Sequence, residues 1–315
     1  MLVSRKFFLA AALASAVTLS AQIKLGIVGT DTSHVIAFTK VLNDPSSKDY
    51  IPGVKIIAAY KGGSNDLESS YTRVDKYAAE LEKDWKIEIV PDIDTLCQKV
   101  DAVLLESVDG RKHLEQAKII IKHKKPMFID KPLAATLEDA REIARLAKAA
   151  GVPWFTASSL RWNSMVETLR VPNTNAVFTW GPGPVDKSHH LDLAWYAIHP
   201  IEMLYALMGP GCVEVTRYET ESGDIVTGKW KDGRTGTVRT NRPYSNYGAV
   251  VFTKDKILQS DPNAKTSYNL MLKEIVSFFQ THKLPVSNEE SLEVFAFMDA
   301  ALRSKQAGGK PTTLR

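Results

Sequence analysis

The stretch that decides the fold is Pro126-Met127-Phe128-Ile129-Asp130-Lys131-Pro132-Leu133. Its first four residues are apolar and predict a short buried strand, and Pro132 predicts that the strand ends at the charged pair before it. In doubly wound folds the ligand binds beyond the carboxyl ends of the parallel strands. Because Lys131 would leave such a strand at that edge, we predict that it lies in a ligand site, with Asp130 beside it.

Strands and helices alternate along the first half of the chain. We predict strands at Ile23–Gly29, Val54–Tyr60, Ile87–Val90, Ala102–Leu105, Pro126–Ile129 and Val152–Ala157. We predict helices between them at His34–Leu42, Ser69–Lys83, Ile93–Lys99, Gly110–Lys122 and Leu137–Ala150. This alternation predicts an α/β domain with a doubly wound parallel sheet of the Rossmann type over residues 22–157.

The pattern changes after about Ser158, where longer strands with polar turns replace the alternation. Strands are predicted at Val213–Glu219, Asp224–Trp230, Thr235–Thr240 and Ala249–Phe252, and closing helices at Ser267–His282 and Ser291–Gln306. The turn Lys231-Asp232-Gly233-Arg234 is typical of a hairpin. We therefore expect residues 158–315 to form an α+β domain with an open, mostly antiparallel sheet.

The composition is that of a globular protein without a strong charge. Of the 315 residues, 44% are hydrophobic and 24% are charged, and the formal net charge is +4. That balance does not indicate a nucleic-acid or membrane-surface partner. Cys97 and Cys212 are far apart in the sequence and are predicted to be free, because a chain of this size needs no disulfide.

The first 21 residues have the pattern of a signal peptide. Arg5 and Lys6 are basic, Phe7 to Leu19 is apolar, and small residues follow at Ser20 and Ala21. The apolar run is shorter than the roughly 20 residues that a membrane-spanning helix needs. We predict cleavage after Ala21 and a periplasmic or secreted protein. Ordinary secretion and a twin-arginine-like route both remain open.

The loop Gly29-Thr30-Asp31-Thr32-Ser33-His34 follows the first strand and precedes a helix. A dinucleotide-binding loop usually reads G-x-G-x-x-G, and only Gly29 fits that pattern. Asp31 replaces the second glycine and adds bulk and negative charge. Thr32, Ser33 and the amides of the helix start can still bind a phosphate. The alternative interpretation is a helix cap without a ligand.

The second predicted strand ends without the carboxylate that usually binds the ribose hydroxyls. The following residues are Lys61-Gly62-Gly63-Ser64. Lys61 and Ser64 suit a 2′-phosphate, so NAD and NADP both remain open, as does a solvated loop without a ligand.

Together these features resemble the glucose–fructose oxidoreductase, inositol dehydrogenase and MocA (Gfo/Idh/MocA) family. Members carry Glu-Lys-Pro where this chain has Asp130-Lys131-Pro132, and the resemblance extends over nearly all of the mature chain. It implies an NAD(P)-dependent oxidoreductase acting on a sugar or polyol, and we expect a homo-oligomer formed through the C-terminal sheet. Because free NAD is scarce outside the cytoplasm, we also expect the cofactor to be tightly bound. In the family the lysine lies beside the nicotinamide and the reacting hydroxyl.

The resemblance also implies roles for individual residues. The segment Asp192–Leu204 looks like a family helix that carries Asp-x-x-x-His, where the histidine is the acid–base group. His199 matches that histidine, whereas Trp195 occupies the aspartate position. The expected catalytic pair is Lys131 and His199. The expected cofactor-binding residues are Gly29, Thr30, Asp31, Thr32, Ser33, His34, Lys61, His113, Asp130 and Lys131. The expected substrate-binding residues are Arg161, Asp192 and Trp195.

Other interpretations of the sequence remain open. His189, His190, Asp192, His199 and Glu202 are residue types that suit zinc, but their spacing is not a recognised zinc pattern, and we predict no metal site. A lyase or glycosidase that uses the nucleotide for a transient oxidation is one alternative function. A non-catalytic sugar-binding protein is the other, and Asp31 and Trp195 favour it.

Overall fold

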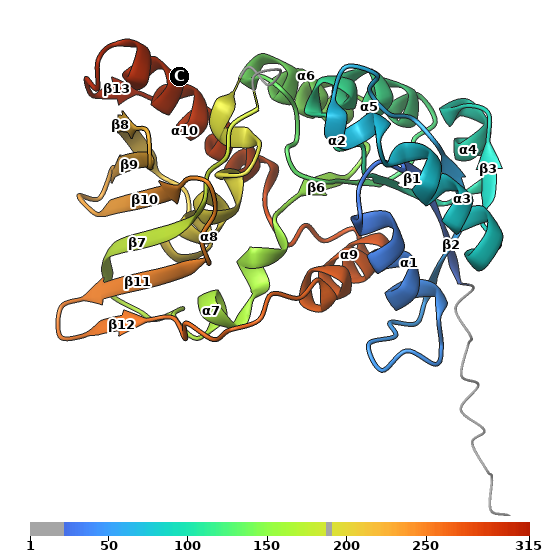
Figure 1. Cartoon of the computed structure of the whole chain (residues 1–315), viewed down its shortest axis with the longest axis horizontal. Coiled ribbons are helices and arrows are strands. Elements are labelled where there is room, and N and C mark those ends of the chain that lie inside the picture. The colour runs from blue at the N-terminus through green and yellow to red at the C-terminus, as the bar shows by residue number, and fades with distance from the viewer. Residues whose placement is uncertain (1–21, 187–190) are drawn as a thin grey trace, which may run out of the picture.

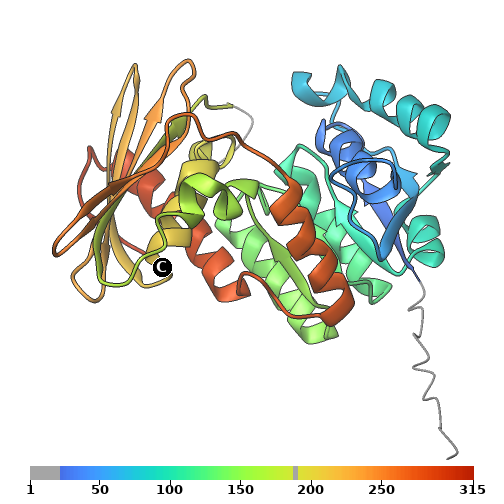
Figure 2. The same ribbon diagram turned by 90° about the horizontal axis from the view of Figure 1, so that it is seen from below.

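The computed structural model describes residues 22–186 and 191–315. The predicted signal peptide, His189 and His190 lie outside these ranges. The chain forms two sheets that lie apart, one in each half of the molecule (Figures 1 and 2). Neither described range contains a helix that is both long enough and apolar enough to cross a bilayer. Cys97 and Cys212 are both buried and free, as predicted.

The first sheet has six parallel strands in the order β3-β2-β1-β4-β5-β6. These are β1 (Ile23–Val28), β2 (Val54–Tyr60), β3 (Glu88–Val90), β4 (Ala102–Leu105), β5 (Met127–Ile129) and β6 (Trp154–Thr156). All residues of β4 and β5 are buried, as the continuous apolar runs predicted. The predicted Rossmann-type sheet is confirmed.

The helices of this half connect successive strands. They are α1 (His34–Asn43), α2 (Glu68–Tyr71), α3 (Val74–Trp85), α4 (Ile93–Lys99), the short 3-10 helix η1 (Gly110–Lys112), α5 (His113–Lys122) and α6 (Leu137–Ala150). Thr136 caps α6 by accepting a hydrogen bond from Asp139 N at 3.0 Å, and Gly151 ends it with φ +67°. The helix predicted at Ser69–Lys83 is instead two helices, because the helical conformation is interrupted at Thr72 and Arg73.

The second sheet has seven strands in the order β12-β11-β7-β10-β9-β8-β13. They are β7 (Thr174–Pro182), β8 (Cys212–Thr220), β9 (Gly223–Trp230), β10 (Thr235–Asn241), β11 (Gly248–Thr253), β12 (Ile257–Gln259) and β13 (Thr312–Thr313). Only the β7–β10 pair is parallel among them, which confirms the mostly antiparallel sheet. Strands β7, β12 and β13 were not predicted.

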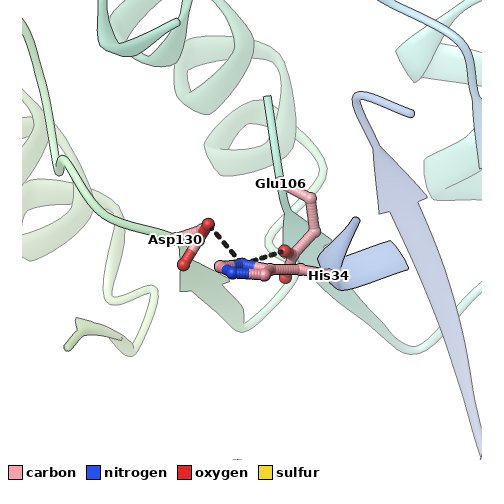
Figure 3. Close-up of side chains that lie close together, drawn as sticks. All are labelled: His34, Glu106 and Asp130. Atoms are coloured by element: carbon pink, nitrogen blue, oxygen red, sulfur yellow. Dashed lines mark hydrogen bonds and ion pairs between the residues drawn. The ribbon is translucent and has the colours of Figure 1, made fainter. Parts of the chain in front are cut away.

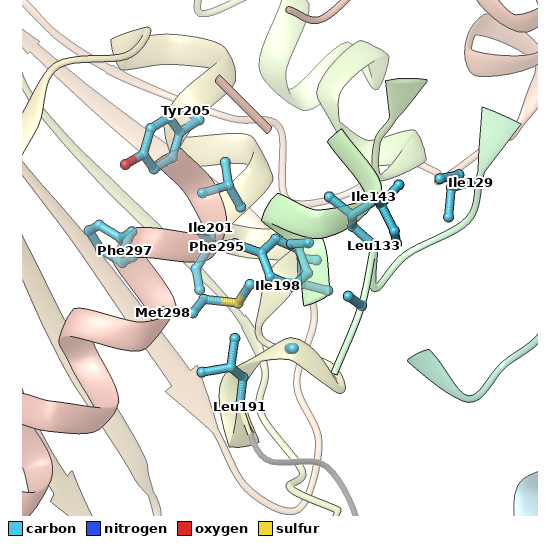
Figure 4. Close-up of a cluster of buried hydrophobic side chains, with 14 of the residues drawn as sticks. Ile129, Leu133, Ile143, Leu191, Ile198, Ile201, Tyr205, Phe295, Phe297 and Met298 are labelled. Carbon is cyan, nitrogen blue, oxygen red and sulfur yellow. The ribbon is translucent and has the colours of Figure 1, made fainter. Parts of the chain in front are cut away.

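Helices α8 (Ile198–Met208) and α10 (Asn288–Gln306) pack on one face of the second sheet, and α10 also packs on α6. Between the sheets, Leu133 and Ile143 of the first half meet Ile198 of α8 and Phe295 of α10 in one hydrophobic core (Figure 4). This shared core fixes the two halves relative to each other. Three short elements connect them, namely η2 (Ser159–Trp162), α7 (Ser164–Glu167) and η3 (Asp192–Ala194).

Helix α9 (Asn269–Thr281) returns from the second half to the parallel sheet, where it lies beside α1 (Figure 1). The ring of Phe278 packs edge-on against Phe155 at 5.0 Å, and Phe155 packs against Phe128 at 5.1 Å. The core of the first sheet therefore includes residues that follow the expected domain boundary at 157.

Candidate functional site

A cavity of about 370 Å³ lies at the carboxyl edge of the parallel sheet, and its walls come from both halves of the chain. This is the edge at which doubly wound folds bind ligands. Seven of the predicted site residues line it, namely Thr32, Ser33, His34, Asp130, Lys131, Trp195 and His199.

Lys131 enters the cavity directly after β5. Its Nζ lies 5.8 Å from the ring centroid of Tyr196 and makes no hydrogen bond within residues 22–186 and 191–315. Burial lowers the pKa of the Lys131 amine, and the Asp130 carboxylate opposes that shift. The amine is therefore available to a ligand and gives up its proton more readily than an exposed lysine does.

His199 reaches the same cavity from the first turn of α8. Its Nδ1 and Ser158 Oγ are 2.7 Å apart, and the rings of Tyr196 and Tyr247 pack edge-on against it. Burial lowers the pKa of His199 well below its ordinary value, and the charge of Lys131 lowers it further. The ring is therefore neutral near pH 7, and its Nε2 has no hydrogen-bond partner in the described part of the chain.

The start of the Gly29–His34 loop has a structural role. Gly29 has φ +92°, and a Cβ there would lie 2.5 Å from the backbone N of Ser107, so only glycine fits. Thr30 Oγ1 donates to Val74 O at 3.0 Å. Thr30 and Asp31 are both 0% exposed, because the segment from 64 to 74 packs over them.

Asp31 turns away from the cavity. One carboxylate oxygen accepts from Val108 N at 3.0 Å, and the other accepts from Ser70 Oγ at 2.6 Å. Burial raises the pKa of Asp31 despite these hydrogen bonds. The Asp31 carboxylate, which the sequence pattern predicted beside the phosphates, instead connects the loop after β1 to α2 and to the loop after β4.

The rest of the loop fits the diphosphate of a dinucleotide. Thr32 and Ser33 line the cavity at the N-terminal end of α1, where backbone amides favour an anion. Arg73 adds a positive charge to the same wall. Beside it, Ser69 Oγ is buried and has no hydrogen-bond partner in the described ranges. These four residues would hold the diphosphate, while Lys131 would lie at the reactive end.

Besides Gly29, Thr30 and Asp31, two more of the predicted cofactor-binding residues lie outside the cavity. His113 is fully buried, with its ring nitrogens 3.2 Å from Leu133 O and 2.8 Å from Ser107 O, so it joins the loops after β4 and β5. Lys61 forms an ion pair with Asp75 on the surface. Neither side chain faces the cavity.

Two of the predicted substrate residues are also placed elsewhere. Arg161 is buried between Glu202, at 2.6 Å, and Glu290. Asp192 lies in η3 instead of on the helix of His199, and it pairs with Arg217 at 2.7 Å. Because Asp192, His199 and Glu202 each bind a different partner, these three do not converge on a metal.

Comparisons with known proteins agree with the fold of the chain. Residues 23–158 match the family described as "Oxidoreductase family, NAD-binding Rossmann fold" (Gfo/Idh/MocA). The match covers all six strands of the parallel sheet. The family resemblance inferred from Asp130-Lys131-Pro132 is thereby confirmed, and the family is one of NAD-binding oxidoreductases. No curated protein matches the chain.

Solved structures share the fold along almost the whole chain. Myo-inositol dehydrogenase from Lactobacillus casei, solved with NAD(H) and myo-inositol, is 18% identical, with a TM-score of 0.70 and coverage of 93% of this chain and 97% of that one. Scyllo-inositol dehydrogenase from the same organism is 13% identical, with a TM-score of 0.73 and coverage of 93% and 98%. An Agrobacterium radiobacter oxidoreductase, solved with NAD+, L-tartaric acid and magnesium, is 13% identical. Its TM-score is 0.72, and the match covers 93% of this chain and 98% of that one.

Sequence reasoning missed several residues of this site. Ser158 supports His199, while Tyr247 and Tyr268 form part of the wall. Arg73 enters through the break between α2 and α3, and Glu106 follows β4. A polar residue directly after a buried strand was a usable signal for Glu106. The others come from loops whose course no local pattern indicates.

Arg161 is expected to stabilise the fold. Arg161→Met would leave Glu202, which is 3% exposed, without its partner, because the guanidinium is the cation that opposes the burial-raised pKa of Glu202. Breaking a buried pair in this way costs about 3–5 kcal/mol. Urea unfolding measures the loss. Arg145→Met, which breaks an exposed pair with Glu142, is the control and should change stability little. Equal midpoints for the two variants would contradict this role.

Proposed function

We propose that the protein is an NAD(P)-dependent oxidoreductase that acts on a hydroxyl group of a sugar or polyol. The observation that carries the proposal is that the Lys131 amine and the His199 imidazole line one cavity at the carboxyl edge of the Rossmann-type sheet. The family match supports the redox class. The inositol dehydrogenases among the structural neighbours support a polyol substrate.

Different residues of the cavity would bind the cofactor, hold the substrate and transfer the proton. Thr32, Ser33 and Arg73 would bind the diphosphate, and the bound nicotinamide would accept or donate the hydride. Lys131 donates a hydrogen bond to the substrate oxygen and holds it in place. When His199 Nδ1 donates to Ser158 Oγ, Nε2 presents its lone pair to the cavity and accepts the hydroxyl proton.

The function is tested with a panel of polyols and sugars, with NAD+ and NADP+ supplied in turn. The proposal expects reduction of the nicotinamide by at least one polyol. Absence of reduction across the panel, with nucleotide binding intact, would point to an elimination or hydrolysis without net redox change. Products of that kind are detected by mass spectrometry of the same mixtures.

The pH dependence follows from the position of His199. Its pKa lies well below the ordinary value of about 6.5, so the ring should still be a neutral base at that pH and should become protonated only in more acidic solution. Removing the neighbouring positive charge in Lys131→Met should raise that pKa, since a nearby cation disfavours the imidazolium ion. NMR titration of the His199 ring protons in both proteins measures the shift. A pKa that is higher in the wild type than in the variant would contradict the arrangement.

Sugar binding without catalysis is the second candidate, and one observation favours it. Thr30 and Asp31 are completely covered by the segment from 64 to 74, so a dinucleotide finds no open surface at the middle of its usual loop. The two functions differ in one simple respect. A sugar-binding protein would bind the polyol in calorimetry without binding NAD+ or NADP+.

We also propose that the chain forms a homo-oligomer through the second sheet. On the face away from α8 and α10, Phe178, Trp180, Val250 and Phe252 project from the adjacent strands β7 and β11. Phe252 is exposed, and the other three side chains are partly exposed. Light scattering of the purified protein tests the proposal, and a monomer at all concentrations would overturn it.

Export would explain why the cofactor should be tightly bound, because free NAD is scarce outside the cytoplasm. We propose that the mature chain begins after Ala21. Intact mass measurement of the protein recovered from a periplasmic extract tests this, and an uncleaved N-terminus would contradict it.

A further inference from the structure

Three potential metal ligands meet at the edge of the cavity, each at the end of a different element (Figure 3). His34 begins α1, Glu106 follows β4, and Asp130 follows β5. Their ligand atoms all lie within 4.8 Å of one another. His34 Nδ1 is 2.8 Å from Asp130 Oδ2 and 3.8 Å from Glu106 Oε2.

Glu106 is the unusual member of this group. It is 0% exposed, and neither of its carboxylate oxygens has a hydrogen-bond partner among the described residues. The distance of 3.8 Å to His34 is too long for a hydrogen bond. A buried carboxylate without a partner is costly, and the neighbouring carboxylates of Asp130 and Asp31 increase that cost. The Lys131 amine is the cation nearby, but it makes no hydrogen bond to Glu106, so both oxygens of this buried carboxylate are free to bind a cation.

We propose that His34 Nδ1, a carboxylate oxygen of Glu106 and a carboxylate oxygen of Asp130 bind a divalent transition-metal ion, with Zn²⁺ as the best-fitting ion. Zinc accepts nitrogen and carboxylate ligands at about 2.0–2.2 Å, which places tetrahedral ligand atoms roughly 3.4 Å apart. The distances of 2.8 and 3.8 Å bracket that separation. The imidazole nitrogen disfavours Mg²⁺ and Ca²⁺, which prefer oxygen ligands.

Three protein ligands leave a fourth position, which is the pattern of catalytic zinc sites rather than structural ones. His34 and Asp130 line the cavity, so that position faces the space where a substrate would bind. It would take a water molecule or a substrate oxygen. None of the three ligands belongs to the set that would hold the diphosphate, so the metal would lie beside Lys131 at the reactive end of the cavity, where His34 and Asp130 are also expected to contact the cofactor.

The test is metal binding by untagged protein. The protein is stripped with a chelator, and Zn²⁺, Mn²⁺ and Mg²⁺ are each titrated by calorimetry, with thermal unfolding as a second readout. We expect Zn²⁺ to bind tightly and to raise the melting temperature. Glu106→Gln keeps the shape of the side chain and removes its charge. It should weaken Zn²⁺ binding by at least about 100-fold, the upper end of the loss caused by changing residues that only hydrogen-bond to metal ligands.

The chain provides a matched control. His123 Nε2 contacts Asp94 at 2.7 Å near the surface, which is a histidine–carboxylate pair without a buried third ligand. The double variant Asp94→Asn/His123→Gln should bind Zn²⁺ like the wild type. If Glu106→Gln melts without metal at or above the wild-type temperature, the fold has survived the change; if it does not fold, Asp130→Asn serves in its place. Absence of Zn²⁺ binding, or equal binding by wild type and the ligand variant, would overturn the proposal and leave Glu106 as a neutral buried acid.

Discussion

Lys131→Met is expected to lower kcat by about 100- to 10,000-fold, the range that general acid–base assistance supplies. The amine makes no hydrogen bond among the described residues and only a distant contact with the Tyr196 ring, and methionine keeps most of the apolar stem. The fold and the affinity for the dinucleotide should therefore persist. The substrate KM should change less than kcat, because the amine acts mainly on the reacting oxygen.

The measurement is steady-state turnover together with calorimetry of nucleotide binding. Lys99→Met is the matched control, since Lys99 forms an exposed pair with Glu88. The control should retain wild-type turnover. A Lys131 variant with unchanged kcat would exclude the amine from the chemistry, and a variant that loses nucleotide binding in parallel would assign it to cofactor binding instead.

His199→Ala is expected to cause a loss of similar size, because it removes the proposed proton acceptor. Ser158→Ala should retain more activity, since it leaves the imidazole in place and removes only the contact at 2.7 Å that orients it. Turnover of both variants, measured across pH, distinguishes these roles. Equal losses in the two variants would mean that His199 acts through Ser158 rather than on the substrate.

The double variant Lys131→Met/His199→Ala tests whether the two residues act together. Both are assigned to one proton transfer, so the combined loss should be smaller than the product of the single losses. Losses that multiply would separate the two residues into different steps.

The sequence predicted the parallel sheet well because its signals are local. The apolar runs at β2 and β4, and the periodic pattern of α6 with Gly151 behind it, gave the observed bounds of all three elements. The helix across Thr72 and Arg73 was mispredicted for a non-local reason. Ser70 Oγ bonds Asp31, and Thr30 bonds Val74 O, so tertiary contacts determine the course of the chain there.

The candidate site was predictable in outline only. The rule that ligands bind at the carboxyl edge of the strands placed Lys131 in the cavity, and the family resemblance added His199. Whether a single polar side chain is buried depends on distant parts of the chain and cannot be predicted from its neighbours in the sequence. Arg161 and Asp192 read as free polar residues in sequence, although each pairs with a residue 25 or more positions away. Glu106 and its two neighbours converge from elements with no common spacing.

The central claim is that this cavity holds a nicotinamide dinucleotide between Thr32–Ser33 and Lys131. The most direct test is mass spectrometry of the small molecules released when the purified protein is denatured, with the amount measured against the protein. We expect NAD(H) or NADP(H) in nearly equimolar amount, and rebinding of the same nucleotide to the stripped protein. Protein that releases no dinucleotide, and that binds neither NAD+ nor NADP+ when these are added, would contradict it.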